Sequence, residues 1–240
     1  MARVTVLGRS GTGKSYYTGY LLEQTVPEFD YAVHFDIEDE EIGLSDADHD
    51  PLYKTLRVDQ ETAANISWVK AIANHEKLRV VPEGLTTEEQ REVYAQIAEA
   101  SLALVKEHVP DATAFISCDE AHNIVRQSAF DDRVERMITG GRKHGLECLH
   151  ISQRPQLLHT TVISQADRRV YFGISDDNDL GKIDKVSNFP ASDLKSLASR
   201  VCIVENKDSG EYEQISTDGI GRQRPHYSGD DGIVDDKLPV

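Results

Sequence analysis

Residues 8–15 read GRSGTGKS, and this segment constrains the fold more than any other part of the chain. It matches the phosphate-binding (Walker A) pattern G-x-x-x-x-G-K-[ST] and lies between an apolar run at 3–7 and a helix-compatible run at 14–24. Its glycines permit backbone angles that turn successive N–H groups toward phosphate oxygens, and the helix that follows adds its positive end. The pattern therefore predicts a strand, a phosphate-binding loop and a helix.

Two side chains of this loop have distinct roles in binding a nucleoside triphosphate. Lys14 would place a positive charge beside the β- and γ-phosphates, and the hydroxyl of Ser15 would be a ligand for Mg²⁺. We expect the whole loop to contact the nucleotide. Its residues are Gly8, Arg9, Ser10, Gly11, Thr12, Gly13, Lys14 and Ser15.

A second segment, TAFISCDE at 113–120, ends an apolar strand in two carboxylates. Ligands bind at the carboxyl ends of strands in open α/β sheets. We expect Asp119 to reach the Mg²⁺ shell, as a Walker B acid does, and Glu120 to polarise the attacking water. An apolar strand followed by acids is common, so this prediction depends on the complete phosphate loop.

Two further candidates flank the next apolar strand, 146–151. Gln153 follows it, and its amide either senses the γ-phosphate and orients water or simply caps a strand end. Arg142 precedes it in the glycine-flanked basic loop GGRKHG at 140–145. That loop is either a solvated surface or the source of an arginine that enters a neighbouring subunit's site, where it would be worth about 10³–10⁵ in rate.

Composition excludes several classes of protein. No apolar run approaches the roughly 18 residues that a membrane-spanning helix needs, and the start MARVTVLG lacks a signal-peptide layout. Cys118, Cys148 and Cys202 lie far apart in apolar stretches, so we interpret them as reduced core thiols. The sequence argues against a secreted, membrane-spanning or disulfide-linked protein.

The acid excess needs its own explanation, because 42 acidic and 26 basic side chains give a net charge of −16. Ten acids and no Lys or Arg lie within 28–50. Such a chain repels nucleic acid unless its basic groups gather on one face. A solvated acidic surface suits a halophilic host, where molar salt screens charges beyond about 3 Å. An ordinary acidic protein is the alternative.

Strand-like and helix-like runs alternate along the chain, which predicts an α/β fold with a mainly parallel central sheet flanked by helices. The expected strands are 3–7, 31–37, 78–81, 113–118, 146–151, 169–174 and 201–205, with 211–216 pairing as a hairpin. The expected helices are 14–24, 61–77, 86–108 and 130–139. We expect an ATPase domain at 1–218. The polar, Gly/Pro/acid-rich tail at 219–240 should pack poorly by itself, being either mobile or laid across a neighbouring subunit.

The segments GRSGTGKS, FISCDEAHN and GRKHGLECLHISQRP together resemble the FtsK–HerA superfamily of nucleic-acid-pumping ATPases, in their order and spacing. The segment 163–183 also resembles the strand and helix that follow in that family, so the likeness covers roughly 1–205. It is greatest to small, single-domain viral members that package DNA into preformed, membrane-containing capsids. An acid-rich composition would fit a virus of haloarchaea.

The resemblance implies a P-loop NTPase core of the RecA-like (ASCE) type with an added strand. It also implies a ring, usually a hexamer, with ATP and Mg²⁺ at subunit borders and double-stranded DNA in the pore. Partners would be capsid or membrane-vertex proteins, and the location would be the host cytoplasm and the packaging vertex of the virion. The carried-over residues are Lys14, Ser15, Asp119, Glu120, Gln153 as sensor, and Arg142 as trans arginine, with Arg133, Arg136 and Arg154 as competitors.

The leading hypothesis is an ATPase that couples hydrolysis to DNA translocation and viral genome packaging. One alternative is a virion-assembly or extrusion ATPase resembling the zonular occludens toxin family, whose usual transmembrane segment is missing here. Another is an ATP-binding regulatory component with little turnover. The acidic run FDIEDEE would make a poor pore surface. Candidates for DNA contact are Lys182, Lys185, Arg168, Arg169, Arg222 and Arg224, although each is more often a salt-bridged surface residue.

Overall fold

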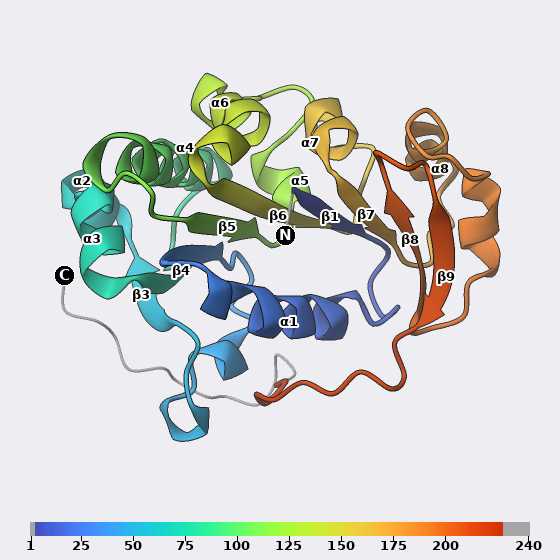
Figure 1. Cartoon of the computed structure of the whole chain (residues 1–240), viewed down its shortest axis with the longest axis horizontal. Coiled ribbons are helices and arrows are strands. Elements are labelled where there is room, and N and C mark those ends of the chain that lie inside the picture. The colour runs from blue at the N-terminus through green and yellow to red at the C-terminus, as the bar shows by residue number, and fades with distance from the viewer. Residues whose placement is uncertain (1–2, 228–240) are drawn as a thin grey trace.

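A nine-stranded sheet with helices on both faces forms the centre of the chain in a computed structural model that describes residues 3–227 (Figure 1). The strand order is β3-β4-β2-β5-β6-β1-β7-β8-β9. The first seven strands are parallel to one another. Strand β8 is antiparallel to its neighbour β7, and β9 is antiparallel to β8. The strands are β1 (Val4–Leu7), β2 (Tyr31–Phe35), β3 (Lys54–Val58), β4 (Lys77–Pro82), β5 (Ala114–Cys118), β6 (Leu146–Ser152), β7 (Arg168–Tyr171), β8 (Val201–Asn206) and β9 (Tyr212–Ser216).

Helices cover the two faces unequally, with α1 on one face and α4, α6 and α7 on the other (Figure 1). The helices are α1 (Lys14–Thr25), α2 (Gln60–Asn65), α3 (Trp68–His75), α4 (Thr87–Ala103), α5 (Ala121–Ile124), α6 (Asp132–Gly140), α7 (Thr160–Gln165) and α8 (Asp177–Ile183). Thr86 and Glu89 form a capping box at the start of α4. Because both faces are covered, β1 and β5 are buried along their whole length, as their continuous apolar runs require.

The predicted fold class is confirmed, but one strand was not predicted and two predicted helices differ in detail. Strand β3 was missed because an edge strand with exposed Lys54 lacks a continuous apolar run. The helix expected at 61–77 is two helices, since Ile66 and Ser67 between them are extended. The helix expected at 86–108 ends in a π-helical turn at Leu104–His108.

The three cysteines are buried and unpaired, which confirms their interpretation as core thiols. Burial raises the pKa of Cys148 to about 12, so this thiol is protonated and unreactive at neutral pH. None of the helices between residues 3 and 227 has the length and apolarity to cross a bilayer.

The beginning of the expected tail packs on the chain itself, contrary to the expectation of poor packing. Residues 220–227 lie against α1 and the 41–50 segment, and Arg222 pairs there with the buried carboxylates of Glu23 and Glu41. The rest of the expected tail, 228–240, lies outside the described residues.

A buried ion pair joins β2 to β4 near the carboxyl end of the sheet. Arg79 is fully buried, and its guanidinium donates to Asp36 at 2.7 Å and to Ser45 Oγ at 3.0 Å. Asp36 is also fully buried and accepts from the backbone N–H of Glu41 at 2.9 Å. The pair therefore ties the acidic segment after β2 to the sheet.

We expect Arg79→Met to lower the free energy of unfolding by about 3–5 kcal/mol, because it leaves the charge of Asp36 buried without its cation. Adding Asp36→Asn should recover part of this loss. Lys54→Met, at an exposed position of β3, should change stability by less than about 0.5 kcal/mol. Urea unfolding measures all three, and an Arg79→Met protein as stable as the Lys54→Met control would contradict the assignment.

Candidate nucleotide-binding site

The predicted site residues other than Arg142 meet at one edge of the sheet because their strands are parallel neighbours. The phosphate loop follows β1, Asp119 and Glu120 follow β5, and Gln153 follows β6. Strand β6 pairs with both β1 and β5, so Gln153 lies between the loop and the acid pair. This is the carboxyl edge, where α/β sheets bind ligands.

The phosphate loop adopts backbone angles that require glycine at two positions. Gly11 has φ +75° and Gly13 has φ +95°, both in the left-handed region. Gly8 has a steric role instead, since a Cβ there would lie 2.5 Å from Cβ of Phe172. The Gly8 N–H donates to the Ser152 carbonyl at 3.2 Å, which attaches the loop to β6. The loop is thus held in a form that places the start of α1 at the pocket.

Lys14 is the first residue of α1, and only 3% of it is exposed. Its Nζ lies 4.0 Å from Glu120 Oε1, which is too far for a hydrogen bond. A buried ammonium needs strong anionic partners, and the oxygens of a triphosphate would supply them. The arrangement therefore fits the predicted role of Lys14.

Asp119 and Glu120 are adjacent but have opposite pKa shifts. Burial raises the pKa of Asp119 to about 7, against the opposing effect of Lys14. Burial would also raise the pKa of Glu120, but a hydrogen bond from His122, the charge of Lys14 and a hydrogen bond from Gln153 outweigh it, so the net pKa is lowered. Glu120 is therefore ionised at neutral pH, as a proton acceptor must be.

The carboxylate of Glu120 is held on both oxygens. Gln153 Nε2 donates to Oε1 at 2.5 Å, and His122 Nδ1 lies 3.0 Å from Oε2. The backbone of Glu120 is left-handed, with φ +43°, an uncommon state for a non-glycine residue that is found at functional sites. The contact with Glu120 gives Gln153 a place in the site beyond that of a strand cap.

A pocket of about 370 Å³ surrounds the phosphate loop. Its lining comprises Arg9, Ser10, Gly11, Gly13, Lys14, Ser15, Tyr16, Glu40, Gln153, Ser199, Arg200 and His226. Glu40 and the nearby Glu38 have raised pKa values, because partial burial adds to repulsion from other carboxylates, including Glu120. Glu40 therefore faces the site, with the exposed Glu38 close by.

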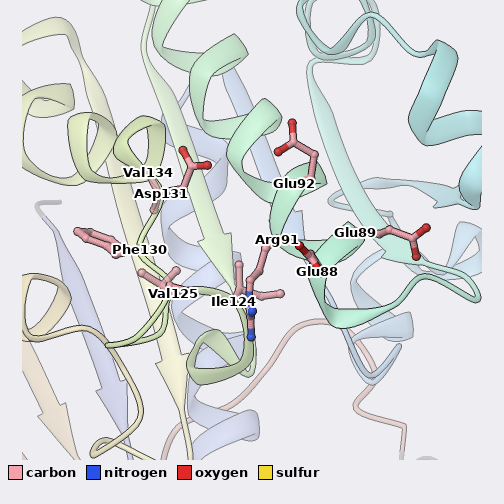
Figure 2. Close-up of a pocket in the computed structure, with 10 residues that line it drawn as sticks. Glu88, Glu89, Arg91, Glu92, Ile124, Val125, Phe130, Asp131 and Val134 are labelled. Carbon is pink, nitrogen blue, oxygen red and sulfur yellow. The ribbon is translucent and has the colours of Figure 1, made fainter.

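A separate pocket of about 540 Å³ lies between the start of α4 and the segment joining α5 to α6 (Figure 2). Figure 2 shows Glu88 and Glu92 on α4, with Asp131 and Phe130 on the other segment. Its carboxylates outnumber its cation, Arg91, so this pocket repels a triphosphate. The phosphate-loop pocket is the better nucleotide site although it is smaller.

Arg142 lies at the opposite edge of the sheet, in the turn Gly141–His144 that precedes β6. Its side chain is 57% exposed and its guanidinium lies 3.2 Å from Asp167. It is therefore remote from the phosphate loop of its own chain. Of the competitors, Arg133 is engaged with Glu92 and Asp131, whereas Arg154 is exposed beside Gln153.

Four of the six candidates for DNA contact are engaged within the chain. Arg169 is buried and pairs with Glu205 at 3.1 Å, Arg222 pairs with Glu41 at 2.9 Å, and Arg224 pairs with Asp50 at 3.1 Å. Lys182 is half-buried and donates to the carbonyls of Gln156 and Leu158. Arg168 and Lys185 are exposed.

Sequence reasoning missed the roles of His122, Tyr16, Ser199, Arg200 and His226. His122 has no zinc-type spacing to another possible ligand, although its place two residues after Glu120 is a usable signal. Arg200 reaches the loop by donating its backbone N–H to the Thr12 carbonyl at 2.9 Å. No local pattern marks Arg200 or His226, since only the fold brings them to the loop.

Whether Mg²⁺ fits the site depends on the donor atoms of the side chains beside the phosphate loop. Between residues 3 and 227 there is no group of three or more His, Cys, Asp or Glu side chains that could hold a metal ion. A nucleotide-bound Mg²⁺ needs no such group, since phosphate oxygens supply part of its shell. Ser15 and Asp119 are hard oxygen donors, and Lys14 lowers the pKa of Asp119, which places that carboxyl near the loop. These residues fit the ion.

We expect Asp119→Asn to stabilise the nucleotide-free protein at pH 8. Folding raises the pKa of Asp119 to about 7, so between about pH 4 and 7 the unfolded chain releases this proton and the folded chain keeps it. The wild type therefore loses stability as the pH rises through this range. The variant should be more stable by about 1–4 kcal/mol at pH 8, in urea unfolding. Asp132→Asn, at an exposed position, should change stability by less than about 0.5 kcal/mol. Destabilisation by Asp119→Asn would contradict the assigned shift.

No protein-family model and no curated protein matches the sequence. Among solved structures, the genome-packaging NTPase B204 from Sulfolobus turreted icosahedral virus 2, in complex with AMPPCP, is 18% identical with a TM-score of 0.65. That alignment covers 89% of this chain and 95% of the other.

Two further solved structures are similar. The DNA-packaging ATPase B204 from Sulfolobus turreted icosahedral virus is 18% identical, with a TM-score of 0.62 over 88% of this chain and 95% of that one. VirB4 of Thermoanaerobacter pseudethanolicus is 11% identical, with a TM-score of 0.63 over 89% and 88%. The chain therefore has the fold of these three proteins, as its resemblance to the FtsK–HerA superfamily implied.

Proposed function

We propose that this chain is an FtsK–HerA-type ATPase that translocates double-stranded DNA to package a viral genome into a preformed capsid. The observation that carries the proposal is the convergence of Lys14, Glu120 and Gln153 at the phosphate loop. This occurs in a fold shared with proteins described as genome-packaging enzymes.

The site has the groups that ATP hydrolysis requires. Water attacks the γ-phosphorus, the bond to the β-phosphate oxygen breaks, and ADP and phosphate leave, while Glu120 accepts the proton of the attacking water. Its lowered pKa keeps it ionised for this role. Gln153, on the same carboxylate, would orient the water beside it.

Mg²⁺ would be held by Ser15 and Asp119 together with the phosphates, and would offset the negative charge that develops on them. Burial favours the protonated form of Asp119, so the cation would stabilise the carboxylate on binding. Two further acids nearby, Glu38 and Glu40, add to the need for a cation.

A ring, most simply a hexamer, would place Arg142 at a neighbour's nucleotide. It lies on the edge of the sheet opposite its own phosphate loop and is exposed there, so any role in catalysis must be exerted on another subunit. Such an arginine would stabilise charge in the transition state.

DNA would be held through its phosphates by exposed cations, without reading of bases. Arg168 and Lys185 remain available for this contact. The net charge of −16 opposes DNA binding in dilute buffer, so we infer a salt-rich host. A packaging role would place the protein at the packaging vertex of the virion, with capsid or membrane-vertex proteins as partners. The ATPase domain would span 1–218.

Steady-state ATPase assays with and without duplex DNA, in dilute buffer and in molar KCl, test the proposal. We expect DNA to stimulate hydrolysis, Lys14→Ala to abolish nucleotide binding or hydrolysis, and Glu120→Gln to bind ATP while turning over at least about 100-fold more slowly. Hydrolysis indifferent to DNA would favour an extrusion ATPase. Binding without hydrolysis in the wild type would favour a regulatory component, and full activity of Glu120→Gln would remove the assigned base.

Mixed rings test the trans role of Arg142. Arg142→Ala and Glu120→Gln proteins should each be inactive, yet a mixture should regain activity at borders that join an intact Glu120 to an intact Arg142. Lys143→Ala, which removes the neighbouring exposed cation, should remain active alone. Absence of recovery on mixing would show that Arg142 is not the trans arginine.

A further inference from the structure

The segment 220–227, here called the C-terminal strap, is bound to the chain by buried charges. Only 2% of the Arg222 side chain is exposed, and its guanidinium lies 2.9 Å from Glu41 and 3.7 Å from Glu23. The carboxylate of Glu23, on α1, also accepts the backbone N–H groups of Gln223 and Arg224 at 2.7 and 2.8 Å. A buried carboxylate with these partners would be costly to leave unpaired, so the strap has a specific seat.

Two glycines outside the strap lie so close to it that a side chain at either position would overlap it. A Cβ at Gly19, in the middle of α1, would overlap the guanidinium of Arg222. A Cβ at Gly43 would overlap the carbonyl oxygen of Pro225. Glycine inside a helix is destabilising relative to alanine. The close approach of the strap explains why a glycine nevertheless occupies position 19.

The strap carries His226 to the phosphate-loop pocket. The rings of His226 and Tyr16 meet edge to face, with centroids 5.9 Å apart, and both residues line the pocket with Lys14 and Ser15. Arg222 holds the arrangement, since one guanidinium nitrogen lies 2.9 Å from His226 Nδ1 and its backbone N–H donates to the Tyr16 hydroxyl at 3.3 Å. The two rings therefore form one aromatic wall, with His226 on its exposed side.

A nucleotide bound by this loop needs two different environments. Lys14 and the loop backbone suit the phosphates, whereas the base needs a flat, apolar contact such as an aromatic ring provides. Tyr16 and His226 line the same pocket as Lys14 and Ser15, so the wall is within reach of a nucleotide bound there. Aromatic contact suits any base, because every base has a π-face.

We propose that the C-terminal strap completes the nucleotide site, with Tyr16 and His226 forming the wall that contacts the nucleobase. This inference rests on the proposed function, since it assumes that a nucleoside triphosphate occupies the phosphate loop. It assigns to residues 220–227 a role in nucleotide affinity within their own chain.

Calorimetric binding of ATP and of inorganic tripolyphosphate, each with Mg²⁺, tests the proposal on the full chain. Tripolyphosphate has the phosphates but no base. His226→Ala and Tyr16→Leu should each weaken ATP binding about five- to hundredfold and leave tripolyphosphate binding within about twofold of the wild type. Lys14→Ala should weaken the binding of both ligands.

Gly19→Ala provides an independent test, because alanine favours the helix while its methyl group displaces Arg222 and with it the strap. It should weaken ATP binding as much as His226→Ala does. Gly181→Ala is the matched control, since a Cβ at that position in α8 meets no atom within 4 Å. Its ATP affinity should equal that of the wild type.

Each outcome bears on a different claim. If the wild type binds neither ATP nor tripolyphosphate, the proposed function is wrong and the strap inference is wrong with it. If it binds both and the His226, Tyr16 and Gly19 variants retain wild-type ATP affinity, only the strap inference is wrong. An equal loss of both ligands in His226→Ala would also overturn the base contact, because the effect would then lie at the phosphates.

Discussion

The buried positive charge of Lys14 is the constraint around which the site is organised. Four carboxylates, those of Glu38, Glu40, Asp119 and Glu120, gather near it at the carboxyl edge of the sheet, after β2 and β5, and on their own they would repel a triphosphate. The lysine offsets part of this repulsion. Together with the hydrogen bond from His122 it lowers the pKa of Glu120, whereas burial prevails at Asp119 and raises its pKa to about 7.

Burial of charge also explains how so acidic a chain holds its shape. Asp36 is paired with Arg79 between β2 and β4, Glu41 with Arg222 in the strap, and Glu205 with Arg169 between β7 and β8. These pairs connect segments far apart in the sequence, so that breaking any one leaves a buried charge unpaired. Some of the 42 acidic side chains are therefore structural, which the interpretation of the acids as a solvated surface did not anticipate.

Arg222 also links the strap to the nucleotide site, since the residue that pairs with the buried Glu41 contacts both His226 and Tyr16. The phosphate loop, the acid pair and the strap come from three separate parts of the chain and are connected here by direct contacts.

Local patterns were sufficient to predict the phosphate loop, the acid pair after β5 and the residue after β6, because each is a short motif attached to an apolar strand. The parallel sheet then follows from the alternation of strands and helices, and it was confirmed. Edge strand β3, the contact of His122 with Glu120, and the seat of the strap were not predicted. They depend on pairings across up to about 200 positions, and such partners are selected by packing and burial of charge in three dimensions, which no local spacing records.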